Sequence, residues 1–178
     1  ARRGADGGTV LGFKARRSWR LVEVRECPIA DPRLVRAFPA LAQVADAFLE
    51  HPKSAPTLHV TWTLTGLDVD VTGVERRSGG LSADARTRAV AAAGRADLAR
   101  LSLAGETLMM ARAPQVMFGP ATVALPAGGF LQAVPEAEAA MVERAVAAAH
   151  RRGMTTSADL MINMPGQTLE EMKADVQR

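Results

Sequence analysis

Few residues in this sequence could carry out covalent chemistry. Cys27 is its single cysteine, and the histidines at positions 51, 59 and 150 lie at no spacing typical of metal ligands or of a base beside a nucleophile. A lone cysteine is more often a small buried apolar residue than a nucleophile or a metal ligand, and we expect that role for Cys27. We expect the histidines on the surface.

Acidic and basic side chains suggest binding more than catalysis. Asp68 and Asp70 alternate with apolar residues, a pattern that fits the solvated face of a strand better than a catalytic pair of carboxylates. A basic cluster near the N-terminus fits either a solvated hairpin tip or a contact with phosphate groups, and both interpretations stay open. The cluster consists of Lys14, Arg16, Arg17 and Arg20.

A Phe-x-Gln segment between a Gly-Gly pair and a helix start is the remaining candidate. The glycines at 128 and 129 free the backbone, Phe130 and Gln132 follow, and Pro135 is typical of a first helical position. A segment of this kind can present side chains to a ligand from a rigid support. Phe130 and Gln132 are therefore candidate binding residues.

Short β-rich runs alternate with single helices before this segment, which predicts a mixed, largely antiparallel α+β domain over residues 1–127. The alternation of apolar and polar residues in the first hairpin predicts one buried and one solvated face. Helices are expected after the caps Asp31 and Ser82, with a fresh start near residue 40 behind Pro39. The expected strand pairs are 9–14 with 19–24, 57–65 with 67–72, 98–103 with 106–111, and 115–118 with 121–125.

The composition is that of a folded protein, with 48% apolar residues and a net charge of +3. That charge is too small to predict a nucleic-acid partner, but residues 1–26 hold seven basic and three acidic residues. A single cysteine fits a reducing compartment, and no apolar run is long enough for a membrane span. We expect a soluble, cytoplasmic monomer with no membrane partner.

An ordered set of motifs resembles the bacterial RNA uridine-5-methyltransferases, which use S-adenosylmethionine to make 5-methyluridine in ribosomal and transfer RNA. The resemblance covers about residues 10–149. The motifs are Leu-Gly-Phe-Lys-x-Arg-Arg-Ser, Leu-Val-Glu-Val-x-x-Cys-Pro-Ile, Gly-Leu-Asp-Val-Asp-Val, and Phe-Gly-x-x-x-Val-x-Leu-Pro-x-Gly-x-Phe-Leu-Gln-Ala.

The resemblance implies a role for each candidate. Gln132 would contact the methyl donor, and Phe130 would lie beside the pocket for a flipped uracil. The basic hairpin with Lys14, Arg16 and Arg17 would contact phosphates of ribosomal or transfer RNA, and 128–152 would form the entrance to a catalytic domain. Cys27 matches the last of four cysteines that hold a 4Fe-4S cluster in many members. We do not expect that cluster here, because the other three are missing.

The family's catalytic cysteine, its base and its donor-binding loop would follow residue 149, and this sequence offers none, so we expect a fragment inactive on its own. Residues 153–178 resemble instead a strand, turn and helix, a short α/β fragment, of radical S-adenosylmethionine proteins of the coproporphyrinogen oxidase type. That resemblance implies a donor contact for Gln167. The join near 150–153 suggests a chimera or truncation. The alternatives are a fragment of such a radical enzyme and a non-catalytic RNA-binding remnant.

Overall fold

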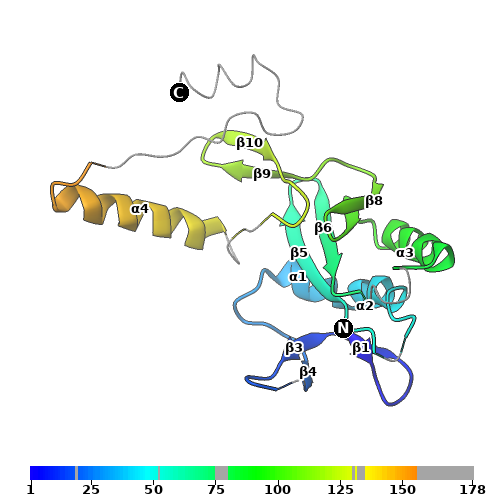
Figure 1. Ribbon diagram of the computed structural model, residues 1–178. Helices are drawn as coiled ribbons and strands as arrows, with labels where there is room; N and C mark the ends of the chain where they lie inside the picture. Colours follow the sequence, from blue (N-terminus) through cyan, green and yellow to red (C-terminus); the bar gives the residue numbers. More distant parts are fainter. Residues whose placement is uncertain (19, 52, 75–79, 130, 132–134, 156–178) are drawn as a thin grey trace. The chain divides into compact units, whose positions relative to one another are not determined.

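The computed structural model describes residues 1–155, except for 19, 52, 75–79, 130 and 132–134 (Figure 1). The contacts divide the chain into two units, Ala1–Pro135 and Glu136–Arg178. The first unit has an α+β fold, as predicted. Its helices are α1 (Pro32–Arg36), α2 (Phe38–Asp46) and α3 (Ala83–Arg95). Its strands are β1 (Arg2–Arg3), β2 (Thr9–Val10), β3 (Gly12–Lys14), β4 (Leu21–Glu23), β5 (Thr57–Thr63), β6 (Gly66–Thr72), β7 (Arg100–Leu103), β8 (Glu106–Met110), β9 (Gln115–Phe118) and β10 (Ala121–Ala124).

A sheet with the strand order β5-β6-β7-β8 is the framework of the first unit. The outer pairs β5–β6 and β7–β8 are antiparallel hairpins, whereas β6 and β7 run parallel. Parallel neighbours need a crossover connection, and α3 lies in the segment that joins β6 to β7. The β7–β8 turn is Ala104–Gly105, and both residues have positive φ angles, of 49° and 84°, as a tight two-residue hairpin turn requires.

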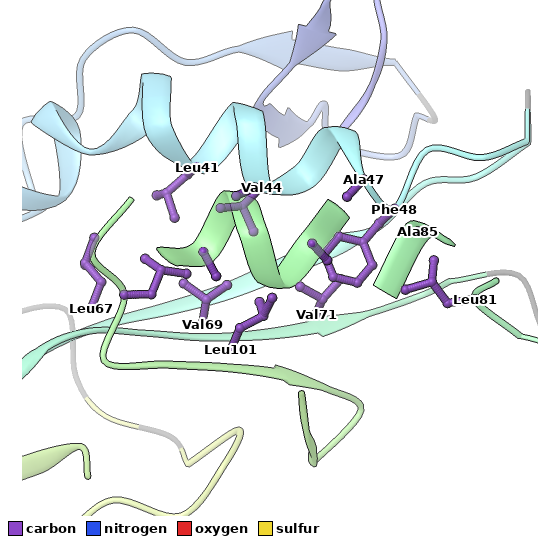
Figure 2. Close-up of a cluster of buried hydrophobic side chains, with 14 residues drawn as sticks. Leu41, Val44, Ala47, Phe48, Leu67, Val69, Val71, Leu81, Ala85 and Leu101 are labelled. Atoms are coloured by element: carbon purple, nitrogen blue, oxygen red, sulfur yellow. The ribbon is translucent and has the colours of Figure 1, made fainter. Parts of the chain in front are cut away.

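The hydrophobic core lies between this sheet and the helices α2 and α3 (Figure 2). Val44 and Phe48, from α2 and the turn after it, are fully buried over the inward-facing Val69 and Val71 of β6. From α3 the buried side chains are alanines, which recur at helical spacing and let the helix lie close to the strands. They are Ala85, Ala89, Ala92 and Ala93.

Local capping signals explain where the helices begin. The carboxylate of Asp31 accepts a hydrogen bond from the backbone N–H of Arg33 at 2.8 Å, with Pro32 in the first position of α1. The hydroxyl of Ser82 accepts one from the backbone N–H of Ala85 at 3.1 Å. Both caps confirm predictions from the sequence. The second helix, predicted to start near residue 40 behind Pro39, starts at Phe38 instead, because proline is tolerated in the first turn of a helix.

The Asp31 carboxyl group should titrate at an unusually low pH. Hydrogen bonds from the side chain and the backbone N–H of Arg33 lower its pKa to about 2. A carboxyl whose pKa is lower in the folded state stabilises that state above its unfolded pKa of about 4, and this contribution disappears as the pH falls through about 2. We expect the NMR titration of Asp31 to move toward pH 4 in Arg33→Gln and to shift little in Arg36→Gln. A midpoint near pH 4 in the unsubstituted chain would contradict this expectation.

The N-terminal strands differ from the prediction. The run expected at 9–14 is divided, because β2 pairs with β1, which was not predicted, and β3 pairs with β4. A Cβ atom on Gly12 would lie 2.0 Å from the carbonyl oxygen of Val22, so only glycine allows the two strands to approach this closely. Gly12 therefore permits the close pairing of β3 with β4.

We expect Gly12→Ala to destabilise the β3–β4 hairpin by about 1–3 kcal/mol, because the added methyl group overlaps the opposite backbone. Hydrogen exchange should become faster at the N–H groups of Ala15 and Val24, which donate to the carbonyls of Arg20 and Leu11. The matched control is Gly94→Ala in α3, where an added Cβ meets no atom within 4 Å. It should stabilise the chain by about 0.5–1 kcal/mol. Equal effects of the two variants would contradict the role of Gly12.

The described part of the second unit contains most of the helix α4 (Pro135–Arg151), which begins at the predicted proline. Apolar side chains of this helix are exposed, among them Met141, Val142 and Val146. No helix in the described ranges is long and apolar enough to cross a membrane. The strand, turn and helix predicted within 153–178 fall almost wholly outside the described residues.

Candidate functional site

Two features of the first unit bear on function, and the first is the tip of the β3–β4 hairpin. The Ala15 N–H donates to the carbonyl of Arg20 at 2.8 Å, and the Ser18 N–H donates to the carbonyl of Ala15 at 3.0 Å. Arg17 has a φ of 52° within this turn. These bonds define a closed turn whose outermost residues, Arg16 and Arg17, are exposed.

The tip carries positive charge that no neighbouring acid offsets. Arg16, Arg17 and Arg20 form no ion pair with any residue in the described part of the chain. Glu23 at the end of β4 is held by the guanidinium of Arg25 through bonds of 3.0 and 3.3 Å. Arg16, Arg17 and Arg20 of the predicted basic cluster are therefore exposed on this hairpin.

The second feature is a buried polar face of the four-stranded sheet, opposite the hydrophobic core. Asp68 and Asp70 are only 4% and 6% exposed, so the prediction that they lie on a solvated face is wrong. The Arg100 guanidinium donates to both carboxylate oxygens of Asp68, at 2.9 and 2.7 Å. It also donates to the carbonyl of Leu125 at 3.0 Å. Arg100 thereby connects the sheet to the segment that follows β10.

Asp70, two residues beyond Asp68 on β6, lies beside the same segment. Its Oδ1 accepts a hydrogen bond from the Gly105 N–H at 3.0 Å, and its Oδ2 lies 3.2 Å from where a Cβ on Gly128 would be. Gly128 has a φ of 70°, so both its conformation and its contact require glycine. Ser102 pairs with Asp70 across β6 and β7, and its buried hydroxyl has no hydrogen-bond partner within the described ranges.

This buried arrangement, which we call the Arg100 anchor (Asp68, Arg100 and the Leu125 carbonyl), holds the backbone just before the Phe-x-Gln segment. Phe130 and Gln132 themselves lie outside the described residues, as does Gln167. Reasoning from the sequence missed Arg100. Its signal was an arginine at the start of a short strand without other charged residues, next in order after a strand with two alternating acids.

Cys27 is half-buried and free, not fully buried as expected. Within the residues that the structure describes, no group of three or more His, Cys, Asp or Glu side chains could hold a metal ion. A 4Fe-4S cluster needs four thiolates, and the chain has one, so its residues do not fit that cofactor. The histidines are exposed, as predicted.

Three relatives of this chain share one description, that of an uncharacterized RNA methyltransferase. The chain is 66% identical over 161 residues to an uncharacterized RNA methyltransferase of Caulobacter vibrioides, a match that covers 90% of this chain and 38% of the relative. A relative of the same description from Mesorhizobium japonicum is 38% identical over 160 residues, with 90% and 37% covered. One from Agrobacterium fabrum is 34% identical over 143 residues, with 80% and 33% covered.

The chain thus spans only 33–38% of the length of these three relatives. No family model matches the chain, and no solved structure matches it significantly. The match to the Caulobacter protein covers 161 of the 178 residues, so it extends past residue 153 even if it begins at residue 1. It therefore includes the predicted join and the start of the tail.

Proposed function

We propose that this chain is part of an S-adenosylmethionine-dependent RNA methyltransferase and that the β3–β4 hairpin holds the phosphates of its RNA. The observation that carries the proposal is the 66% identity to a protein named as an RNA methyltransferase, over 90% of this chain. The exposed, unpaired arginines at the hairpin tip give the proposal a physical basis, because phosphate contacts supply most of the affinity in sequence-independent binding.

The finer proposal is that the reaction modifies C5 of uracil in ribosomal or transfer RNA. It rests on the resemblance of the motifs around Cys27, Asp68 and Gln132. S-adenosylmethionine would supply the methyl group when bound. The amide of Gln132 both donates and accepts hydrogen bonds, which suits the polar groups of that donor. Phe130 would pack against the extruded base, and the Arg100 anchor would keep the preceding backbone in place.

Methyl transfer by the 178-residue chain alone is expected to be undetectable. The uracil-5 reaction needs a cysteine that adds to C6 of the base, and the single cysteine, Cys27, matches a cluster-ligand position of that family instead. The measurement is mass spectrometry of undermodified RNA after incubation with S-adenosylmethionine. Formation of 5-methyluridine would contradict this prediction while supporting the uracil-5 proposal. The radical-enzyme alternative depends on residues around Gln167, outside the described part, and stays a prediction.

RNA binding tests the main proposal directly. We expect the chain to bind RNA with an affinity that falls as salt rises, and Arg16→Ala/Arg17→Ala to weaken binding. The slope of log K against log salt should become shallower by about 1–1.5, since each phosphate contact to a single strand contributes about 0.7. Fluorescence anisotropy at several salt concentrations measures both quantities.

A charge-matched control shows whether the hairpin arginines form a binding site for RNA or only add to the general attraction between positive charge and RNA. Arg36→Ala/Arg95→Ala removes the same charge from exposed helical positions outside the hairpin. It should leave the affinity and the salt slope close to those of the unsubstituted chain. Equal losses in the two double variants, or no RNA binding at all, would refute the assignment of the hairpin.

A further inference from the structure

The β3–β4 hairpin carries large apolar side chains in water beside its basic tip. Phe13 is 66% exposed and Val22 is 46% exposed, although the alternation predicted a buried face for this hairpin. The two residues are direct partners in the register of β3 and β4. Partners in an antiparallel pair project from the same face with their Cβ atoms about 5 Å apart. Phe13 and Val22 thus form one apolar surface.

The surroundings of this pair vary along the hairpin. Leu11 and Val24, one step inward on the same face, are partly buried, and Leu11 packs against the hydrophobic core. One step outward, Arg20 lies on the same face, opposite Ala15. Toward the tip, the side chains on this face are therefore first packed against the core, then apolar and exposed, and finally positively charged. An aromatic ring next to unpaired arginines is a combination that proteins use to bind single-stranded nucleic acid, because the ring stacks on bases and the arginines attract phosphates.

We propose that Phe13, backed by Val22, is a stacking platform for an unpaired base of RNA, while Arg20 and the tip arginines hold the flanking phosphates. This inference rests on the proposed function. It adds a preference for unpaired RNA. Bases in an A-form duplex are stacked on one another and cannot lie on a protein ring, whereas unpaired bases can. The hairpin thus favours single-stranded segments or loops over duplex RNA.

The positive charge beside Phe13 and Val22 favours RNA over other ligands for this exposed apolar pair. A protein partner would have to supply several acids to match Arg16, Arg17 and Arg20, whereas each nucleotide brings one phosphate. A membrane surface would also attract these cations, and vesicles of anionic lipid distinguish it from RNA. Binding to such vesicles that depends on Phe13, without an effect of Phe13 on RNA affinity, would overturn the proposal.

The test compares an unstructured RNA strand of about 12 nucleotides with a duplex of the same length, a size within the range of single-strand binding sites. Phe13→Leu keeps the apolar bulk and removes the ring, and Phe13→Tyr keeps the ring. We expect Phe13→Leu to weaken single-strand binding by about tenfold and to leave duplex binding and the salt slope unchanged. Phe13→Tyr should bind like the unsubstituted chain. In NMR spectra, the ring protons of Phe13 should shift upfield with the single strand only.

Different results would contradict the phosphate contact at the hairpin tip and the stacking platform at Phe13. If Arg16→Ala/Arg17→Ala weakens binding and Phe13→Leu does not, the phosphate contact stands and the stacking platform is wrong. If Phe13→Leu weakens single-strand and duplex binding equally, the preference for unpaired bases is wrong. If the unsubstituted chain binds neither RNA, both proposals fail. Hydrogen exchange at the N–H groups of Ala15 and Val24 verifies that the hairpin is formed in every variant.

Discussion

Replacing Arg100 with alanine is expected to lower the free energy of unfolding by about 3–5 kcal/mol. The side chains of Arg100 and Asp68 are only 9% and 5% exposed, and three hydrogen bonds of 2.7–3.0 Å hold the guanidinium in place. Removing the arginine leaves a buried carboxylate without its partner and the carbonyl of Leu125 without its donor. Urea denaturation followed by circular dichroism measures the loss.

A double variant shows whether the loss comes from the stranded charge. Asp68→Leu/Arg100→Met replaces the pair by apolar side chains, and it should recover most of the stability that Arg100→Ala loses. In all these variants we expect faster hydrogen exchange at the N–H groups of Leu125 and Gly129, because the Leu125 carbonyl no longer holds the segment to the sheet. A loss below about 1 kcal/mol in Arg100→Ala would mean that water replaces the pair, and the Arg100 anchor would then be wrong.

Phe48→Ala should cost a similar amount, about 3–5 kcal/mol, for a different reason. Phe48 is 0% exposed and lies in the cluster between α2, α3 and the sheet (Figure 2). Truncation leaves a cavity that the surrounding alanines of α3 are too short to fill. The matched control is Phe118→Ala on β9, where the ring is 43% exposed, and its loss should be clearly smaller. Equal losses would contradict the assignment of the core.

Together these substitutions separate the two faces of the sheet. Phe48 reports on the apolar face, which packs against the hydrophobic core, and Arg100 reports on the polar face, which holds the backbone ahead of the candidate binding residues. Hydrogen exchange at the Gly129 N–H shows whether the two roles are distinct. Arg100→Ala should speed this exchange through local opening, whereas Phe48→Ala should speed it only through global unfolding.

Features with local causes could be predicted from the sequence. Asp31, Ser82 and Pro135 mark helix starts because a cap or a fixed φ acts within a single turn of the chain. The β9–β10 hairpin could be predicted because its turn residues lie between two short β-forming runs. The basic tip was visible because charge can be counted without knowledge of the fold.

Features that depend on distant residues could not be predicted. Alternation placed Asp68 and Asp70 on one face of a strand, but that face is buried because residues distant in sequence cover it, among them Arg100, Leu125 and Gly128. Likewise, alternation in the first hairpin placed Val22 on one face without showing whether anything covers it. The division of the predicted first strand follows from its pairing with residues 2–3, which no local signal indicates.

The α+β class, most of the turns and caps, and the basic hairpin could be predicted from local sequence, because propensity and charge are properties of neighbouring residues. Which polar residues are buried and which apolar ones are exposed follows from the three-dimensional packing instead. Burial depends on which segments meet in space, and here a segment after β10 covers one pair of acids while Phe13 and Val22 remain in water.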